Sequence, residues 1–103
     1  MSPAGKSQKK RVLRLRLFIA GDAPNSLSAI HNLRATLAAH PYAEADLEIV
    51  DVLKHPEVGL RENVLVTPTM LKLAPAPERK IIGNLKDTVA LAALLGLVNV
   101  DYD

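Results

Sequence analysis

The first candidates for chemistry in this sequence are Ser26, Asp51 and the three histidines. Ser26 follows Asp22 and Pro24 in a turn that is expected to open a helix, with Asp22 accepting a hydrogen bond from the first turn. A hydroxyl near a helix N-terminus could polarise a bound thiolate such as that of glutathione, but a structural serine that satisfies first-turn amides is favoured. Asp51 ends an apolar segment and is interpreted as a turn or capping carboxylate rather than a general base.

Thiol chemistry is excluded because the 103 residues include no cysteine. Disulfides, dithiol exchange and cysteine-based metal sites are therefore all absent. The spacing of His31, His40 and His55 matches no zinc signature, so no metal site is expected. No nucleophile–base pair can be recognised either. The sequence thus predicts a protein that is not an enzyme and that has no cofactor.

Positive charge is concentrated at the N-terminus. Residues 1–16 contain six of the thirteen Lys and Arg residues and no acid, namely Lys6, Lys9, Lys10, Arg11, Arg14 and Arg16. Such an arm could bind nucleic acid or an acidic partner, but a solvated, disordered arm over residues 1–11 is favoured, and no nucleic-acid ligand is expected. Arg14 and Arg16 interrupt any secretory signal, and no stretch approaches the ~20 apolar residues of a membrane span. We therefore expect a cytoplasmic protein.

The first half of the chain predicts a strand–helix–strand unit. Over residues 12–20, apolar side chains alternate with Arg14 and Arg16, which indicates a strand with one buried face. Residues 24–39 carry leucine and isoleucine at helical spacing. The alternation resumes over residues 45–52, and the two strands are expected to be parallel with a right-handed connection. Lys54–Asn63 fits a short helix and a strand equally well.

The segment from Val64 to Gly83 organises the second half. It predicts two strands, Val66–Leu73 and Arg79–Ile82, joined by a turn that contains Pro75 and Pro77. Pro68 stands ahead of the first of these strands, where thioredoxin-like folds place a cis-proline, so a cis peptide bond is expected there.

A final helix is predicted from Val89 to Leu95, with Asn84 as its N-cap and Asp87 completing an approximate capping box. The order of elements is that of an α/β, thioredoxin-like β-α-β-α-β-β-α fold with a mixed four-stranded sheet. The expected domain covers residues 12–98, between the basic arm and a short acidic tail over residues 99–103.

Several segments together resemble the circadian clock protein KaiB family. They are LFIAGDAPNS (17–26), IVDVLKHP (49–56), LVTPT (65–69), KLAPAP (72–77) and RKIIGNL (79–85). The resemblance implies a non-catalytic protein that binds the clock ATPase KaiC, and through that complex sequesters KaiA and affects output histidine kinases. It also implies a metamorphic second half: a thioredoxin-like monomer binds the ATPase, and a different strand–helix order occurs in a homotetramer.

The resemblance also suggests which residues matter. Basic family positions are matched by Lys72, Arg79 and Lys80, whereas Glu48 and Asn63 stand where family members usually carry lysine. These five residues are the expected partner-binding positions, and the two departures suggest a divergent paralogue with altered binding. The expected switch positions are Pro68, Pro75, Pro77, Gly83, Ala92 and Ala93. Alanine favours a helix over glycine by ~1 kcal/mol per residue. Ala92 and Ala93 should therefore favour the form in which residues 85–95 are helical, and the thioredoxin-like form is predicted to dominate.

Two functions from different classes follow from these observations. The leading one is a KaiB-like module that binds a KaiC-type ATPase. The alternative is a glutathione-binding, thioredoxin-like enzyme that uses Ser26. A histidine-kinase sensor domain is a third interpretation, disfavoured because no coiled-coil linker or kinase region follows Asp103.

Overall fold

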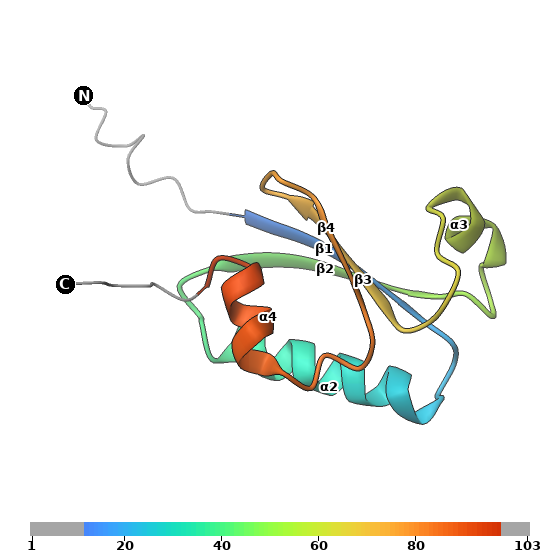
Figure 1. The fold of residues 1–103 in the computed structure, drawn as a ribbon, viewed down its shortest axis with the longest axis horizontal. Helices are drawn as coiled ribbons and strands as arrows, with labels where there is room; N and C mark the ends of the chain where they lie inside the picture. Colours follow the sequence, from blue (N-terminus) through green and yellow to red (C-terminus); the bar gives the residue numbers. More distant parts are fainter. Residues whose placement is uncertain (1–11, 98–103) are drawn as a thin grey trace.

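Seven elements occur in the predicted order (Figure 1). The computed structural model describes residues 12–97. The elements are β1 (Val12–Ile19), α2 (Pro24–Ala38), β2 (Glu44–Asp51), α3 (Pro56–Arg61), β3 (Thr69–Ala74), β4 (Arg79–Ile82) and α4 (Thr88–Leu94). This order confirms the predicted thioredoxin-like fold. The proposed arm, residues 1–11, and the tail, residues 99–103, lie outside the described residues.

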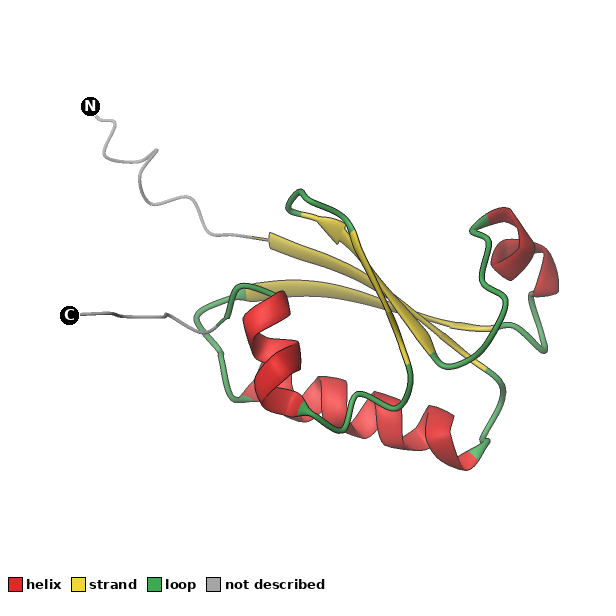
Figure 2. Cartoon of the chain, viewed as in Figure 1, coloured by secondary structure: helices red, strands yellow, loops and turns green. Residues whose placement is uncertain are grey.

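The sheet has the strand order β2-β1-β3-β4. β1 is parallel to β2 and antiparallel to β3, which is in turn antiparallel to β4, so the sheet is mixed as predicted. Figure 2 shows α2 and α4 together on one face of the sheet and α3 beyond one end of the strands. The face turned away from α2 and α4 is called the open face below.

The core follows from the alternation in β1. Leu13, Leu15 and Leu17 are buried against Leu33 of α2 and Leu91 of α4 on the helix face. A smaller cluster on the open face joins side chains from β1, β2 and β3 with two from α3 and the loop after it: Phe18, Val50, Leu71, Val58 and Val64. The open face is therefore only partly covered, and its remaining positions can carry charge.

The structure corrects one position of the predicted face of α2. Of the residues at helical spacing, Leu33 is buried and Ile30 and Leu37 pack against the core, but Leu27 is exposed. The fully buried positions of the helix are Ser26, Ala29, Leu33 and Thr36. Three of these four residues are small, which lets the helix backbone approach the sheet closely. Asp22 was also expected to cap the helix, but α2 begins at Pro24, so Ala23 is the N-cap and no side chain caps the helix.

Two assignments in the middle of the chain are now settled. Lys54–Asn63, which the pattern left undecided, contains the helix α3, with Glu57 in its first turn and Arg61 in its last, as the helix dipole favours. β3 begins at Thr69 rather than Val66, because the chain bends through residues 66–68. The predicted cis bond at Thr67–Pro68 is confirmed, and the bonds preceding Pro75 and Pro77 are also cis.

The predicted cap of the last helix was three residues too early. Asp87, not Asn84, is the N-cap of α4, and its carboxylate accepts a hydrogen bond from the Ala90 amide at 3.0 Å. Asn84 instead accepts from the Lys86 amide at 3.1 Å. The chain cannot continue as helix from Asn84 because Leu85 has a φ of 61° and is buried in the core. None of the helices between residues 12 and 97 has the length and apolar character needed to span a membrane.

Candidate protein-interaction surface

Arg16 links two elements across the open face. Its Nε lies 2.8 Å from a carboxylate oxygen of Glu48 on β2, and a terminal guanidinium nitrogen lies 3.2 Å from a carboxylate oxygen of Glu62, the residue that ends α3. The arginine therefore connects α3 to the sheet and compensates the acid at position 48. Neither Arg16 nor Glu62 was predicted from the sequence as a partner-binding residue. The signal was the polar position of Arg16 within an alternating strand.

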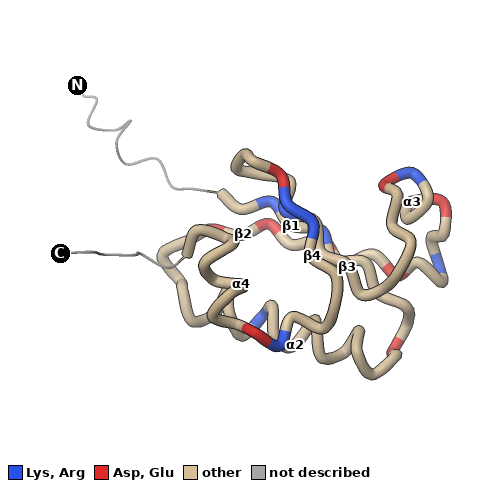
Figure 3. Tube along the Cα trace, in the orientation of Figure 1, with Lys and Arg blue, Asp and Glu red and all other residues tan. Residues whose placement is uncertain are grey.

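Three of the expected partner-binding residues lie together at the β3–β4 hairpin and form the basic corner: Lys72, Arg79 and Lys80. Figure 3 shows positive residues over β1 and β4, and both charges around α3. The three residues line one concave site of about 300 Å³, together with Leu71, Leu73, Glu62 and Glu78. Glu48 lies apart from it, on the far edge strand of the sheet.

The side chains of the basic corner differ in what they can offer a partner. Lys72 is only 5% exposed, and its ammonium donates a hydrogen bond to the Pro77 carbonyl at 3.1 Å, so it stabilises the hairpin from within. Arg79 is exposed and donates to the neighbouring Glu78 carbonyl. Lys80 is also exposed and donates to the Asn63 carbonyl at 3.2 Å, which joins β4 to the loop after α3. Arg79 and Lys80 thus keep their charge at the surface.

An exposed apolar patch lies at the α3 end of the molecule and consists of Leu53, Leu60, Leu65 and Val66. Leu60 is 73% exposed and Leu65 88% exposed. All four side chains line one shallow concavity of about 420 Å³. Contiguous exposed apolar surface of this kind marks interaction sites. Sequence reasoning missed it because Val64–Val66 was partly assigned to a strand. Alternate residues of a strand point to opposite faces, so one face cannot bury all of Val64–Val66. This run of three apolar residues was the signal in the sequence for an exposed apolar surface.

The remaining chemical candidates are structural. Ser26 is 1% exposed, and its hydroxyl accepts a hydrogen bond from the Ala20 amide at 3.0 Å, so it joins the end of β1 to α2 and leaves no accessible hydroxyl for a ligand. Asp51 accepts from the amides of Gly21 and Leu53 at 3.0 and 2.9 Å. These two bonds, the one from Gly21 first, hold the pKa of Asp51 below its ordinary value. Asp51 is thus the predicted turn carboxylate. No cluster of three histidine, aspartate or glutamate side chains suited to a metal occurs between residues 12 and 97.

The expected switch positions lie at the borders of the second-half elements. Pro68 precedes β3, and Pro75 and Pro77 form the turn between β3 and β4. Gly83 follows β4 with a φ of 121°, a conformation that side chains with a Cβ rarely adopt. On α4, Ala92 is buried in the core and Ala93 faces solvent.

These features define a class of protein: a thioredoxin-like domain that lacks the thiols of redox members and presents charged and apolar surfaces. The fold is similar to that of the N-terminal domain of Synechococcus elongatus SasA, with a TM-score of 0.70, 24% identity, and coverage of 99% of this chain and 97% of that one. It is also similar to mitochondrial thioredoxin 3 of Saccharomyces cerevisiae, with a TM-score of 0.67, 18% identity, and coverage of 91% and 85%.

Sequence similarity is more specific. The family model for the KaiB domain matches residues 16–97. The circadian clock oscillator protein KaiB of a Cyanothece strain is 40% identical over 96 residues, which cover 93% of this chain and 91% of the relative. The corresponding protein of Trichodesmium erythraeum is 40% identical over 81 residues, covering 79% and 78%. The chain belongs to the KaiB family.

Proposed function

We propose that this protein is a non-catalytic binding module of a circadian clock or clock-like signalling system, and that it binds a KaiC-type ATPase in its thioredoxin-like state. The observation that carries the proposal is KaiB membership in a chain whose described residues adopt the thioredoxin-like arrangement. A KaiA-like protein and a histidine kinase are further partners that the family suggests. In this state the protein acts as a monomer, and a homotetramer belongs to the alternative arrangement of the second half.

The basic corner and the apolar patch contribute differently to binding. Leu60 and Leu65 supply apolar area of the kind that is desolvated at the centre of an interface. Arg79 and Lys80 supply exposed charge, which mainly sets association rate and partner choice. Asn63 lies between the two surfaces, since it follows α3 and receives the Lys80 hydrogen bond. Glu48, compensated by Arg16, lies on the open face, as Lys80 does.

The test is titration of the full chain into the KaiC-type hexamer of the same organism, followed by biolayer interferometry. Leu65→Asp is expected to abolish binding, because a charge would replace an apolar side chain that the partner desolvates. Lys80→Glu is expected mainly to slow association and to alter its salt dependence. Arg34→Glu, an exposed charge reversal on α2, is the matched control and is expected to bind as the unmodified chain does.

A glutathione titration runs alongside as the competing arm. Saturable binding of glutathione without any binding of the hexamer would overturn the proposal. If the unmodified chain and Leu65→Asp bind the hexamer equally well, the proposed partner is supported, but the apolar patch is not its binding surface.

A further inference from the structure

β4 forms one edge of the sheet. It is the last strand in the order, and within residues 12–97 it pairs with β3 alone. The Gly83 amide donates to the Pro68 carbonyl at 3.0 Å, so the alternation of the antiparallel ladder directs the backbone groups of Ile81 toward β3. The N–H and C=O groups of Lys80 and Ile82 therefore point away from the sheet, and no backbone partner for them occurs among residues 12–97. An edge of this kind can accept another strand.

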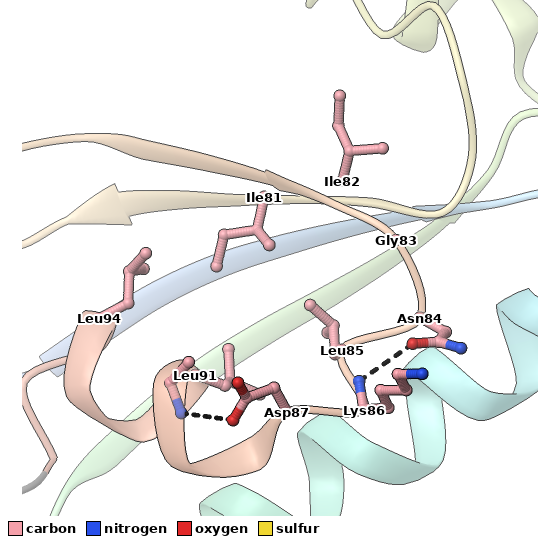
Figure 4. A pocket seen from close by; sticks show the side chains of 10 residues that line it. Ile81, Ile82, Gly83, Asn84, Leu85, Lys86, Asp87, Leu91 and Leu94 are labelled. Carbon is pink, nitrogen blue, oxygen red and sulfur yellow. Dashed lines mark hydrogen bonds between the residues drawn. The ribbon is translucent and has the colours of Figure 1, made fainter.

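A groove lies directly beside this edge, between β4 and α4 (Figure 4). In the figure, Ile81 points toward α4 and the loop before it, whereas Ile82 points to the opposite face. The cavity is about 280 Å³ and is lined mainly by apolar side chains, among them Leu85, Leu91 and Leu94. A cavity of ~150 Å³ suffices for benzene, so this one takes one large aliphatic or aromatic side chain.

The charges on β4 itself favour an acidic occupant. β4 carries Arg79 and Lys80 and no acid, whereas the opposite edge strand, β2, carries Glu44, Asp46, Glu48 and Asp51 and no base. A strand placed beside β4 would set its side chains alternately next to Ile81 on the helix face and next to Lys80 and Ile82 on the open face. Alternating apolar and acidic residues satisfy both faces at once. The same peptide would meet like charges along β2.

We propose that the β4 edge and the adjoining groove bind an extended peptide of a partner protein in which acidic and aliphatic residues alternate. The peptide adds a fifth strand through hydrogen bonds to Lys80 and Ile82, inserts one aliphatic side chain beside Ile81, and places its acids near Lys80. The inference does not depend on the identity of the ATPase partner. It uses the opposite edge of the sheet from Glu48 and a groove that shares no lining residue with the apolar patch, and Lys80 contributes to both proposed surfaces.

A second copy of the chain fits this edge less well than a short peptide. β4 has four residues, of which only Lys80 and Ile82 face outward. Stable interfaces between proteins bury ~800 Å² on each partner, and pairing along so short an edge would supply only part of that area. A peptide needs only the edge and the groove.

The experiment is an NMR titration of the ¹⁵N-labelled full chain with a blocked seven-residue probe, acetyl-Asp-Val-Asp-Leu-Asp-Val-Asp-amide. Saturable shift changes are expected across residues 79–87 and 90–94. Amide exchange at Lys80 and Ile82 is expected to slow, while exchange at Ile81, already paired with β3, changes little. A control peptide of the same composition, with its acids and aliphatic residues in separate blocks, is expected not to saturate.

Three variants test the three parts of the proposal. Ile82→Pro removes one outward amide without removing a ladder bond, and Ala90→Trp fills the groove from the exposed side of α4. Both are expected to abolish binding while the spectrum remains that of a folded chain. Lys80→Glu is expected to weaken binding about fivefold or more, whereas Lys54→Glu, a charge reversal in the segment after the opposite edge strand β2, is expected to leave it unchanged.

Other outcomes would overturn the proposal. These are no saturable change at about 1 mM probe, shift changes centred on β2, or unaltered binding by both Ile82→Pro and Ala90→Trp. Concentration-dependent self-association of the chain that Ile82→Pro abolishes would assign the edge to a second copy and not to a partner peptide.

Discussion

The ion pairs of Arg16 allow a quantitative test of how α3 is held. Both partners are close: Glu48 at 2.8 Å and Glu62 at 3.2 Å. Distance alone would make the Glu48 pair the stronger by a small margin. Exposure acts in the opposite direction, because the Glu48 side chain is 60% exposed and that of Glu62 only 33% exposed. The effective dielectric constant changes the Coulomb energy by more than the difference between these two distances does. Burial should therefore determine which ion pair is the stronger.

The prediction is that Arg16 is coupled more strongly to Glu62 than to Glu48. Exposed pairs contribute about 0.2–1 kcal/mol in double-mutant cycles. We therefore expect about 0.2–0.4 kcal/mol for the Glu48 pair and about 0.5–1 kcal/mol for the Glu62 pair. The assay is urea unfolding of Arg16→Met, Glu48→Gln, Glu62→Gln and the two double variants, with each coupling energy taken from its cycle.

Two further measurements separate this reasoning from a general loss of stability. Both couplings should shrink in 1 M salt, where the screening length is ~3 Å, and the more exposed Glu48 pair should shrink first. Amide exchange in α3 should accelerate in Glu62→Gln and not in Glu48→Gln, because of the two acids only Glu62 belongs to α3, as its C-cap, whereas Glu48 lies on β2. A Glu48 coupling equal to or larger than that of Glu62 would refute the argument from burial.

Three other predictions concern single positions. Asp51→Asn should lower the Tm at neutral pH. Because the folded-state pKa of Asp51 lies below its ordinary value of 3.8, the difference in Tm should persist above that value and vanish as the pH falls through the folded-state pKa. A difference in Tm that stays constant in thermal scans down to low pH would contradict this. Asp87→Ala should cost about 1 kcal/mol in urea unfolding as a lost helix cap, and Asn84→Ala less, and the reverse order would restore Asn84 as the cap. In solution, carbon secondary shifts over residues 88–94 should be helical in the major species, and strand-type shifts there would show that the alternative arrangement dominates.

The sequence predicted the elements well because their patterns are local. β1 alternates strictly, and its buried leucines are those that the alternation indicates. The second half was recognisable because the prolines at 75 and 77 separate two short apolar runs. These signals depend only on neighbouring residues, and the connection rules then add the parallel pairing of β1 with β2.

Features that depend on contacts across the fold could not be predicted in the same way. The buried face of α2 is set by how closely the helix approaches the sheet, which favours Ala29 over Leu27 although leucine is the more apolar residue. The cap of α4 was misassigned to Asn84, although the helix itself begins within one residue of the prediction, because Leu85, which follows Asn84, has a positive φ and is buried in the core. Propensity and capping rules carry no information on either contact.

The candidate surfaces were predicted in part for the same reason. The charges of Arg79 and Lys80 were visible in the sequence, and both remain exposed. Lys72 looked equivalent to them, yet its ammonium lies inside the hairpin against the Pro77 carbonyl. The residues next to a lysine in a strand do not indicate whether its ammonium will be exposed or buried in the fold. The apolar patch was missed because it forms only where the chain bends before Thr69.

Asn63 suits the backbone conformation of the loop that follows α3. Its φ of 60° lies in the left-handed region, which asparagine tolerates better than most residues with a Cβ. Two cations also reach this short segment, since Arg16 binds the carboxylate of Glu62 and Lys80 binds the carbonyl of Asn63. A lysine at position 63 would bring a third positive charge to the same place and would gain no backbone advantage. Asparagine instead adopts the left-handed conformation more readily and adds no charge. The loop that joins the apolar patch to the basic corner is thus bound to the sheet twice, through Arg16 on β1 and through Lys80 on β4.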